Sequence, residues 1–407
     1  MTDGTTEAGT LRGLAPRERL AVSGLFLANG LVVGAWAPRI PSFKADLGIS
    51  EGTLGLMILA FGLGSLAAMP LVGLILAREG SRRVALAGAF ALAPVMLLIT
   101  LAPGLWTSAA ALALTGALVG GMDVAMNANA VSVERRMGRA IMSSCHGFWS
   151  LGGLIGAASG GVLIARAGVW GHAAVVMVAV LAIAALALPA TLRDAPEAAG
   201  PAGDGARGAI SAAALLPAAL LGIMALFSMT PEGTVLDWSA LYLRDELGGS
   251  VEAAGLAFAG FSATMALMRF SGDLIRDRLG AVLTLRLCTL VAGAGLLTAA
   301  FADGPATATL GFAVAGLGMA NMVPIAFSSA GAIPGLPQGV GISIVTFMGY
   351  SGLLFAPSLI GFVAERTGLA AIFAALPLLY VVVLALSGLA RWADPAEGRA
   401  PGRQAGR

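Results

Sequence analysis

The chain has 407 residues, of which 58% are hydrophobic and only 11% are charged, and its mean hydropathy is +0.89. A soluble domain carries about 25% charged residues, so this composition excludes a water-soluble globule and predicts a polytopic membrane protein. The formal net charge of +2 gives no basis for a nucleic-acid partner.

The apolar stretches divide the chain into two similar halves, since a bilayer span needs about 20 mostly apolar residues. A polar tail is expected at residues 1–16. The first six spans, within residues 17–189, are expected at 18–38, 52–77, 84–102, 106–130, 141–165 and 169–189. A cytoplasmic linker is expected at 190–213. The second six, within residues 214–391, are expected at 214–241, 252–272, 282–302, 306–330, 340–364 and 369–391. A second polar tail is expected at 392–407.

A repeat with a constant offset of 200 residues relates the two halves. The residues that recur are Lys44, Leu47, Gly48, Arg78, Gly80, Gly152, Gly161, Arg166 and Gly168, as Arg244, Leu247, Gly248, Arg278, Gly280, Gly352, Gly361, Arg366 and Gly368. Duplicated apolar halves with several spans each are typical of secondary transporters. The sequence therefore predicts an all-α membrane protein with twelve transmembrane helices in two six-helix bundles.

The basic residues predict the orientation. With the N-terminus in the cytoplasm, the cytoplasmic side holds all the basic residues except Arg39, Lys44, Arg166, Arg244 and Arg366. This asymmetry follows the positive-inside rule and places both termini in the cytoplasm. The two cysteines, Cys145 and Cys288, fall within spans and are expected to be buried thiols.

The loop after the second span carries a recognisable signature. It runs from Gly73 to Arg83 and resembles the Major Facilitator Superfamily loop, a glycine followed by Asp-Arg-x-Gly and basic residues, with Ala77 in place of the aspartate. The loop after the eighth span keeps the motif as Asp277-Arg278-Leu279-Gly280. The resemblance covers the whole chain. It implies two bundles related by pseudo-two-fold symmetry and transport of a small-molecule solute by alternating access.

Three further stretches resemble one branch of that superfamily. They are Gly121-Met-Asp123-Val-Ala-Met-Asn127, Ser143-Ser-Cys-His146-Gly147 and Glu232-Gly233-Thr-Val-Leu-Asp237-Trp238-Ser239. They are similar to the YbjJ-like bacterial inner-membrane permeases, near the fucose-permease-like transporters. The resemblance implies a protein of the bacterial inner membrane that moves a small polar solute or sugar-like metabolite. A monomer that uses the proton gradient as its drive is expected.

Ionisable residues inside spans are candidates for proton coupling, because each costs about 2.5–3.5 kcal/mol on insertion scales. Asp123, Glu232, His146 and Asp237 are the candidates. Pro231 and Gly233 flank Glu232 and favour a broken helix there. The alternatives are a structural acid between helices for Asp123, a kink for Glu232, a helix-bridging histidine for His146 and a surface cap for Asp237.

The resemblance also predicts substrate contacts, since it places spans 1, 4, 7 and 10 around a central cavity. The candidates are Asn29, Trp36, Asn127, Trp149, Trp238, Asn321 and Tyr350. Asn127 lies one helical turn from Asp123 and shares its face. Indole rings offer polarisable faces to a solute, but each tryptophan could equally be packing.

Charged residues cluster where the cytoplasmic ends of the two halves meet. Arg78, Arg82 and Arg83 face Asp277 and Arg278 in this reading and are the expected cytoplasmic gate. Glu134, Arg135, Arg136, Arg139, Asp273 and Arg276 belong to the same clusters. The alternative is an ordinary solvated face.

No nucleophile–base constellation, metal-ligand spacing or phosphate-binding loop is found, so neither an enzyme nor a metal or cofactor is predicted. Gly152-x-x-x-Gly156-Ala157-x-x-Gly160-Gly161 resembles the antiporter glycine signature, with Ala157 in place of its proline. A proton-coupled drug or metabolite efflux antiporter is therefore the alternative function.

Overall fold

The computed structural model describes residues 5–49, 51–194, 212–249 and 251–394, and in these residues the regular structure is helical throughout. The first half contains α1 (Thr5–Trp36), η1 (Ala37–Arg39), α2 (Ile40–Leu47), α3 (Glu51–Glu79), α4 (Ser81–Leu92), α5 (Val95–Leu101), α6 (Leu105–Met137) and α7 (Met142–Ala187). The second contains α8 (Ala212–Asp245), α9 (Val251–Leu279), α10 (Ala281–Ala300), α11 (Pro305–Met319), α12 (Met322–Ala330), α13 (Gln338–Thr367), α14 (Leu369–Ala375), α15 (Pro377–Leu386) and η2 (Ser387–Ala393).

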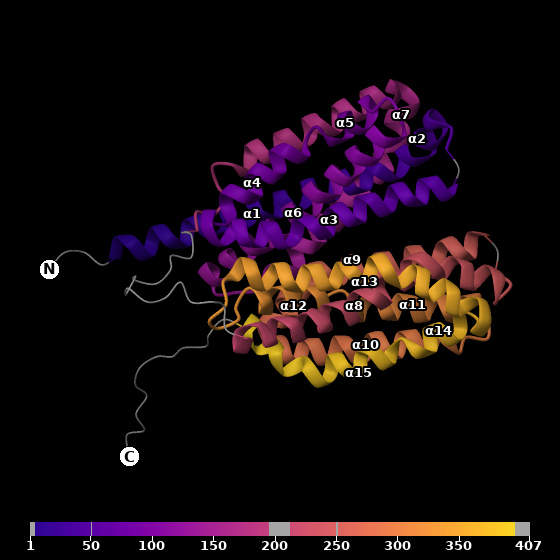
Figure 1. The fold of residues 1–407 in the computed structure, drawn as a ribbon. Helices are drawn as coiled ribbons and strands as arrows, with labels where there is room; N and C mark the ends of the chain where they lie inside the picture. The colour runs from indigo at the N-terminus through magenta and orange to yellow at the C-terminus, as the bar shows by residue number, and fades with distance from the viewer. Residues whose placement is uncertain (1–4, 50, 195–211, 250, 395–407) are drawn as a thin grey trace, which may run out of the picture.

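The helices form two bundles that lie side by side, α1–α7 above α8–η2 in Figure 1. Ten stretches of the described chain are long and apolar enough to cross a bilayer. One of them, Met142–Ala187, holds two helices joined at Gly168, whose backbone is non-helical. The 29-residue helix α9 is not among the ten stretches, but it is long enough to span a bilayer. The count of twelve spans is thus reached, with six in each bundle.

The duplication seen in the sequence recurs in the backbone. Glycines with positive φ stand at matching places in the halves, a conformation that L side chains rarely adopt. The pairs are Gly48 and Gly248 (φ 60° and 64°), Gly80 and Gly280 (77° and 76°), and Gly168 and Gly368 (68° and 79°). Each pair marks a sharp turn between helices, so the repeated glycines hold the two bundles to one topology.

A matching clasp closes each half. The Asp194 carboxylate accepts hydrogen bonds from the backbone amides of Ser81 (2.9 Å) and Arg82 (3.1 Å), at the start of α4. The Asp394 carboxylate accepts from the amide of Ala281 (2.8 Å), at the start of α10. A carboxylate at a helix N-terminus satisfies free amides and complements the helix dipole. Both aspartates lie in segments expected as linker and tail, of which residues 195–211 and 395–407 are outside the described residues.

The N-terminal segment differs from the expectation. Helix α1 begins at Thr5, so most of residues 1–16, expected as a tail, is helical backbone continuous with the first span. Six of residues 5–16 are strong helix formers, although Gly9, Gly13 and Pro16 in the same stretch are poor ones.

Close approach of α1 and α7 shapes the centre of the first bundle. A side chain at Gly30 would collide with the backbone of Trp149, and one at Gly34 with the backbone of Gly153. Small residues allow such contact between helices in a bilayer. The contact holds Trp149 beside α1, where it reaches the central cavity described below.

Candidate functional site

A central cavity of about 360 Å³ lies between the two bundles. Both halves contribute to its wall, through α1, α3, α6 and α7 on one side and α8, α9, α12 and α13 on the other. Its size is within the range of small-molecule sites, about 300–1,000 Å³. Most of the wall is apolar. The polar residues that line it are Ser65, Asp123, His146, Trp149, Glu232, Arg269 and Tyr350.

A hydrogen-bonded chain of Asp123, Asn127 and His146 forms the polar wall on the side of the first half. The Nδ2 atom of Asn127 donates to the backbone oxygen (2.8 Å) and to Oδ1 (3.3 Å) of Asp123. The Nε2 atom of His146 donates to Oδ1 of Asn127 over 3.2 Å. The Oδ2 atom of Asp123 is buried without a partner in the described structure. Such an atom is costly unless a proton or a ligand meets it.

Trp149 is held in place from behind. Its Nε1 donates to Oδ1 of Asn29 over 2.9 Å, and Nδ2 of Asn29 donates to the oxygen of Val119 over 3.1 Å. Asn29 is buried, at 1% exposure, and does not line the cavity. It therefore orients the indole ring that does.

An ion pair forms the polar wall on the side of the second half. Nη2 of Arg269 lies 2.9 Å from Oε1 of Glu232, and Nη1 donates to Oγ of Ser150 in the first half over 2.6 Å. The sequence analysis assigned Arg269 to the cytoplasmic side, which was wrong, because Arg269 lines the central cavity. Its position inside the expected span 252–272 was the signal that could have indicated this place.

Four of the predicted site residues lie away from the cavity. Asp237 is exposed, and with Trp238 it borders a crevice between α8 and α13 that is too narrow for water. Trp36 packs edge-on against Phe43, with ring centroids 5.1 Å apart. Asn321 is buried beside Cys288, with Nδ2 3.9 Å from the sulfur. The cavity thus gathers Asp123, His146, Trp149, Glu232 and Tyr350, with Asn29 and Asn127 directly behind.

Here we name the end of the bundles where α1 begins and η2 ends the terminus side (Figure 1). Of the five predicted gate residues, Asp277 connects the halves there: it accepts from the amide of Ala140 (2.7 Å) and pairs with Arg139 (3.8 Å). The others show different surroundings. Arg82 donates to the oxygen of Leu188 and Arg83 pairs with Glu79, both within the first half, and Arg78 and Arg278 are exposed.

The deepest contacts between the halves on this side involve Glu134. Its Oε1 lies 2.8 Å from Nη1 of Arg276, and its Oε2 accepts from Oγ of Ser328 over 2.7 Å. Close by, the Asp273 carboxylate accepts from the amides of Ser143 (2.9 Å) and Ser144 (3.0 Å) at the start of α7. These contacts close the terminus side.

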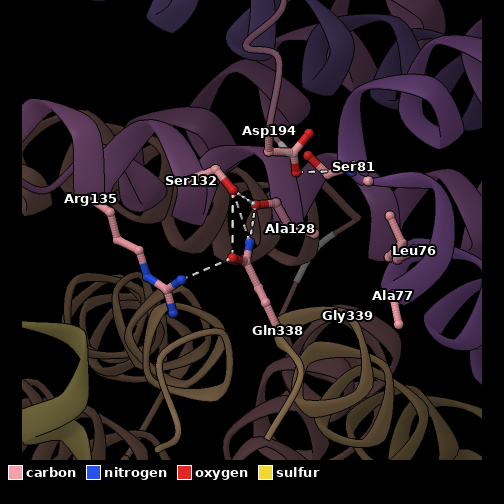
Figure 2. Close-up of a pocket in the computed structure, with 10 residues that line it drawn as sticks. Leu76, Ala77, Ser81, Ala128, Ser132, Arg135, Asp194, Gln338 and Gly339 are labelled. Atoms are coloured by element: carbon pink, nitrogen blue, oxygen red, sulfur yellow. Dashed lines mark hydrogen bonds between the residues drawn. The ribbon is translucent and has the colours of Figure 1, made fainter. Parts of the chain in front are cut away.

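Where Ala77 replaces the aspartate of the loop signature, a side chain from the second half makes polar contacts instead. A pocket of about 160 Å³ has Ala77 on its wall. Gln338 reaches into it from the first turn of α13 (Figure 2). The side chain of Gln338 donates to the oxygen of Ala128 and accepts from Nη1 of Arg135 over 3.2 Å. A glutamine from the second half thus bridges the halves where the family's loop signature has a carboxylate in the first.

Restoring that carboxylate is expected to strengthen closure of the terminus side. Ala77→Asp places a negative charge beside the start of α13, where a helix dipole favours it by about 0.3–1 kcal/mol. We expect labelling of a cysteine introduced at Ala128 by a membrane-impermeant maleimide to slow about two- to five-fold. Ala77→Asn, which lacks the charge, is the matched control. Equal rates in both variants would contradict the expectation.

Comparison with known proteins agrees with this architecture. The family model described as the Major Facilitator Superfamily matches residues 22–243 and 233–406. The chain belongs to the Major Facilitator Superfamily. As a member, it is a multi-pass membrane transporter of a small-molecule solute and not an enzyme.

Two bacterial relatives resemble this superfamily member over most of its length. An uncharacterised MFS-type transporter of Yersinia pestis is 35% identical over 88% of this chain and 92% of its own. The membrane protein MosC of Rhizobium meliloti is 32% identical over 86% of this chain and 84% of its own.

Two solved structures share the fold. The E. coli fucose:proton symporter superposes with a TM-score of 0.73 at 17% identity, over 91% of this chain and 98% of its own. The proton:xylose symporter XylE gives 0.69 at 15% identity, over 93% and 95%. At these identities the likeness establishes the architecture of this transporter alone.

Proposed function

We propose that the protein is a proton-coupled importer of a small polar or sugar-like solute. The observation that carries the proposal is one cavity in which Asp123 and His146 of the first half face the Glu232–Arg269 pair of the second. Buried ionisable groups in a bilayer mark ion and substrate paths. Asp123 has one carboxylate oxygen free to take a proton or a solute hydroxyl, and it carries the coupling in this proposal.

The orientation and location follow the basic residues. The terminus side faces the cytoplasm in this proposal, because it carries most of the arginines. The bacterial relatives support the inner membrane, and the motifs around Asp123, His146 and Glu232 support the YbjJ-like branch. The halves then rock about the central cavity as a monomer, and the contacts of Glu134 and Asp273 hold the cytoplasmic side shut while the solute enters from outside.

The walls of the cavity suit a solute with both polar and apolar faces. Trp149 and Tyr350 offer ring surface, and Asp123 offers an acceptor for a hydroxyl group. The mostly apolar remainder of the wall also supports the alternative, proton-coupled efflux of an apolar compound. Uptake into proteoliposomes driven by an inward proton gradient supports import, whereas uptake driven by an acidic lumen, with protons leaving as the compound enters, supports antiport.

The proposal is tested through Asp123→Asn. A thermal-shift screen against sugars and small metabolites first identifies a solute, since a ligand stabilises the state that it binds. In proteoliposomes with a lumenal pH dye, the wild type should acidify the lumen when that solute enters. Asp123→Asn should lose proton movement at least about 100-fold, because the amide cannot take up a proton.

The matched control is Asp303→Asn, the same change at an exposed loop residue. It should acidify the lumen at the wild-type rate. Solute uptake without proton movement in the wild type, or equal proton movement in wild type and Asp123→Asn, would overturn the coupling.

A further inference from the structure

A second cavity, of about 640 Å³, opens on the terminus side. It lies between the end of α6 in the first half and α9, α12 and η2 in the second, so it is complete only when the halves are together. It is separate from the central cavity and shares no lining residue with it.

Four arginines line this cavity: Arg135, Arg139, Arg276 and Arg391. Arg135 donates to the backbone oxygen of Gly331 and to the amide oxygen of Gln338, neither of which carries a charge. Arg391 lies over the Trp392 ring, 5.6 Å from its centroid. Neither has a carboxylate partner among the described residues.

The acids on the same wall are already engaged. Glu134 binds Arg276, Ser328 and the amide of Ile141 (2.9 Å), and both carboxylate oxygens of Asp394 accept from the amide of Ala281. Asp277, next to the cavity, is 3.8 Å from Arg139.

The basic groups outnumber the acidic ones. Four arginines against Glu134, Asp394 and Asp277 leave an excess of one positive charge. Nε of Arg276 is buried with no hydrogen-bond partner among the described residues. Most buried donors in proteins are paired, so this guanidinium is only partly satisfied by the protein.

We propose that this cavity binds a phosphate-bearing anion. Guanidinium groups match phosphate oxygens in charge and in donor geometry, and the indole ring of Trp392 offers a face for an attached ring or chain. The anion enters from solution as a small phosphorylated metabolite or from the bilayer as a phospholipid headgroup; both present the same chemistry.

Such an anion regulates the transporter because the arginines that bind it belong to both halves. Arg135 and Arg139 come from α6, whereas Arg276 and Arg391 come from α9 and η2. A bound phosphate bridges them and favours the closed terminus side over the open one. The terminus side faces the cytoplasm in the proposed function. A cytoplasmic phosphate compound therefore slows the step in which the central cavity opens toward the cytoplasm.

The test uses the purified full-length protein with sodium pyrophosphate as the soluble probe, and nanodiscs of phosphatidylglycerol or phosphatidylcholine as the lipid probe. At a hundredfold excess over its Kd, pyrophosphate should raise the Tm of the wild type by at least about 3 °C. Arg139→Gln and Arg391→Gln should each lose most of that shift. Arg193→Gln removes the same charge from an exposed position outside the cavity and should keep it.

A second readout needs no comparison of stability between variants. Pyrophosphate should slow maleimide labelling of a cysteine introduced at Ala128, where the halves meet, and Arg391→Gln should abolish the slowing. A slowing in phosphatidylglycerol nanodiscs but not in phosphatidylcholine supports the headgroup as the source. No shift and no slowing in any arm, or equal effects in Arg391→Gln and Arg193→Gln, overturns the site; neither result bears on proton coupling at Asp123.

Discussion

Arg269→Gln is expected to lower the free energy of unfolding by about 3 kcal/mol, because it leaves the Glu232 carboxylate without its charge partner in a largely buried setting. The side chains of Glu232 and Arg269 are 16% and 9% exposed, and Arg269 also holds Ser150 across the two halves. The loss should appear as a fall of several degrees in the Tm of the purified protein. Removing both charges in Glu232→Gln with Arg269→Gln should recover most of it, since no unpaired charge remains.

The chain supplies its own control for this ion pair. Arg244 and Asp245 form an equally close pair, at 2.7 Å, on the exposed end of α8. Exposed pairs contribute little to stability because water screens them, so Arg244→Gln should leave the Tm unchanged. If Arg269→Gln proved as stable as Arg244→Gln, the Glu232–Arg269 pair would not be buried as described.

Glu134→Gln is expected to open the terminus side. The carboxylate joins α6 to Arg276 and Ser328 of the second half, and its loss leaves the buried Arg276 guanidinium without a counter-charge. Breaking a buried ion pair costs about 3 kcal/mol. That cost falls on the closed state, so the ratio of open to closed molecules should rise about 100-fold.

Labelling of a cysteine at Ala128 measures this shift, because Ala128 is buried where Gln338 crosses between the halves. The rate should rise steeply in Glu134→Gln. In Glu79→Gln, which breaks an exposed pair within the first half, it should stay at the wild-type value. An unchanged rate in Glu134→Gln would mean that other contacts, such as those of Asp273, hold the closed side alone.

The architecture was predictable from signals that the sequence shows directly. Span length and the glycines that turn out to have positive φ act over short stretches of chain, the 200-residue repeat reveals the two halves, and the family follows from short motifs. Asp123 and Glu232 were identified for a similar reason, since an acid within an apolar span is conspicuous by itself. The extent of α1 was missed because its polar start lacks an apolar pattern and contains Gly9, Gly13 and Pro16, which are poor helix formers.

The pairings between halves were not predictable from the same signals. Arg269 and Ser150 are 119 residues apart, and Glu134 and Arg276 are 142 apart. Helical periodicity tells which face a residue occupies but not which helix lies opposite. Asp237 shows a second limit, which is that an acid within a span need not face the cavity. It carries the same chemistry as Asp123, but five residues along α8 from Glu232 it lies on a different face of the helix, away from the cavity.

The clasps at Asp194 and Asp394 have a consequence for how the molecule moves. Each fastens the last stretch of one bundle to the start of a helix in that same bundle, so neither has to break when one bundle tilts against the other. Each half therefore keeps its own internal geometry while the two bundles rock, and it moves as a self-contained rigid unit.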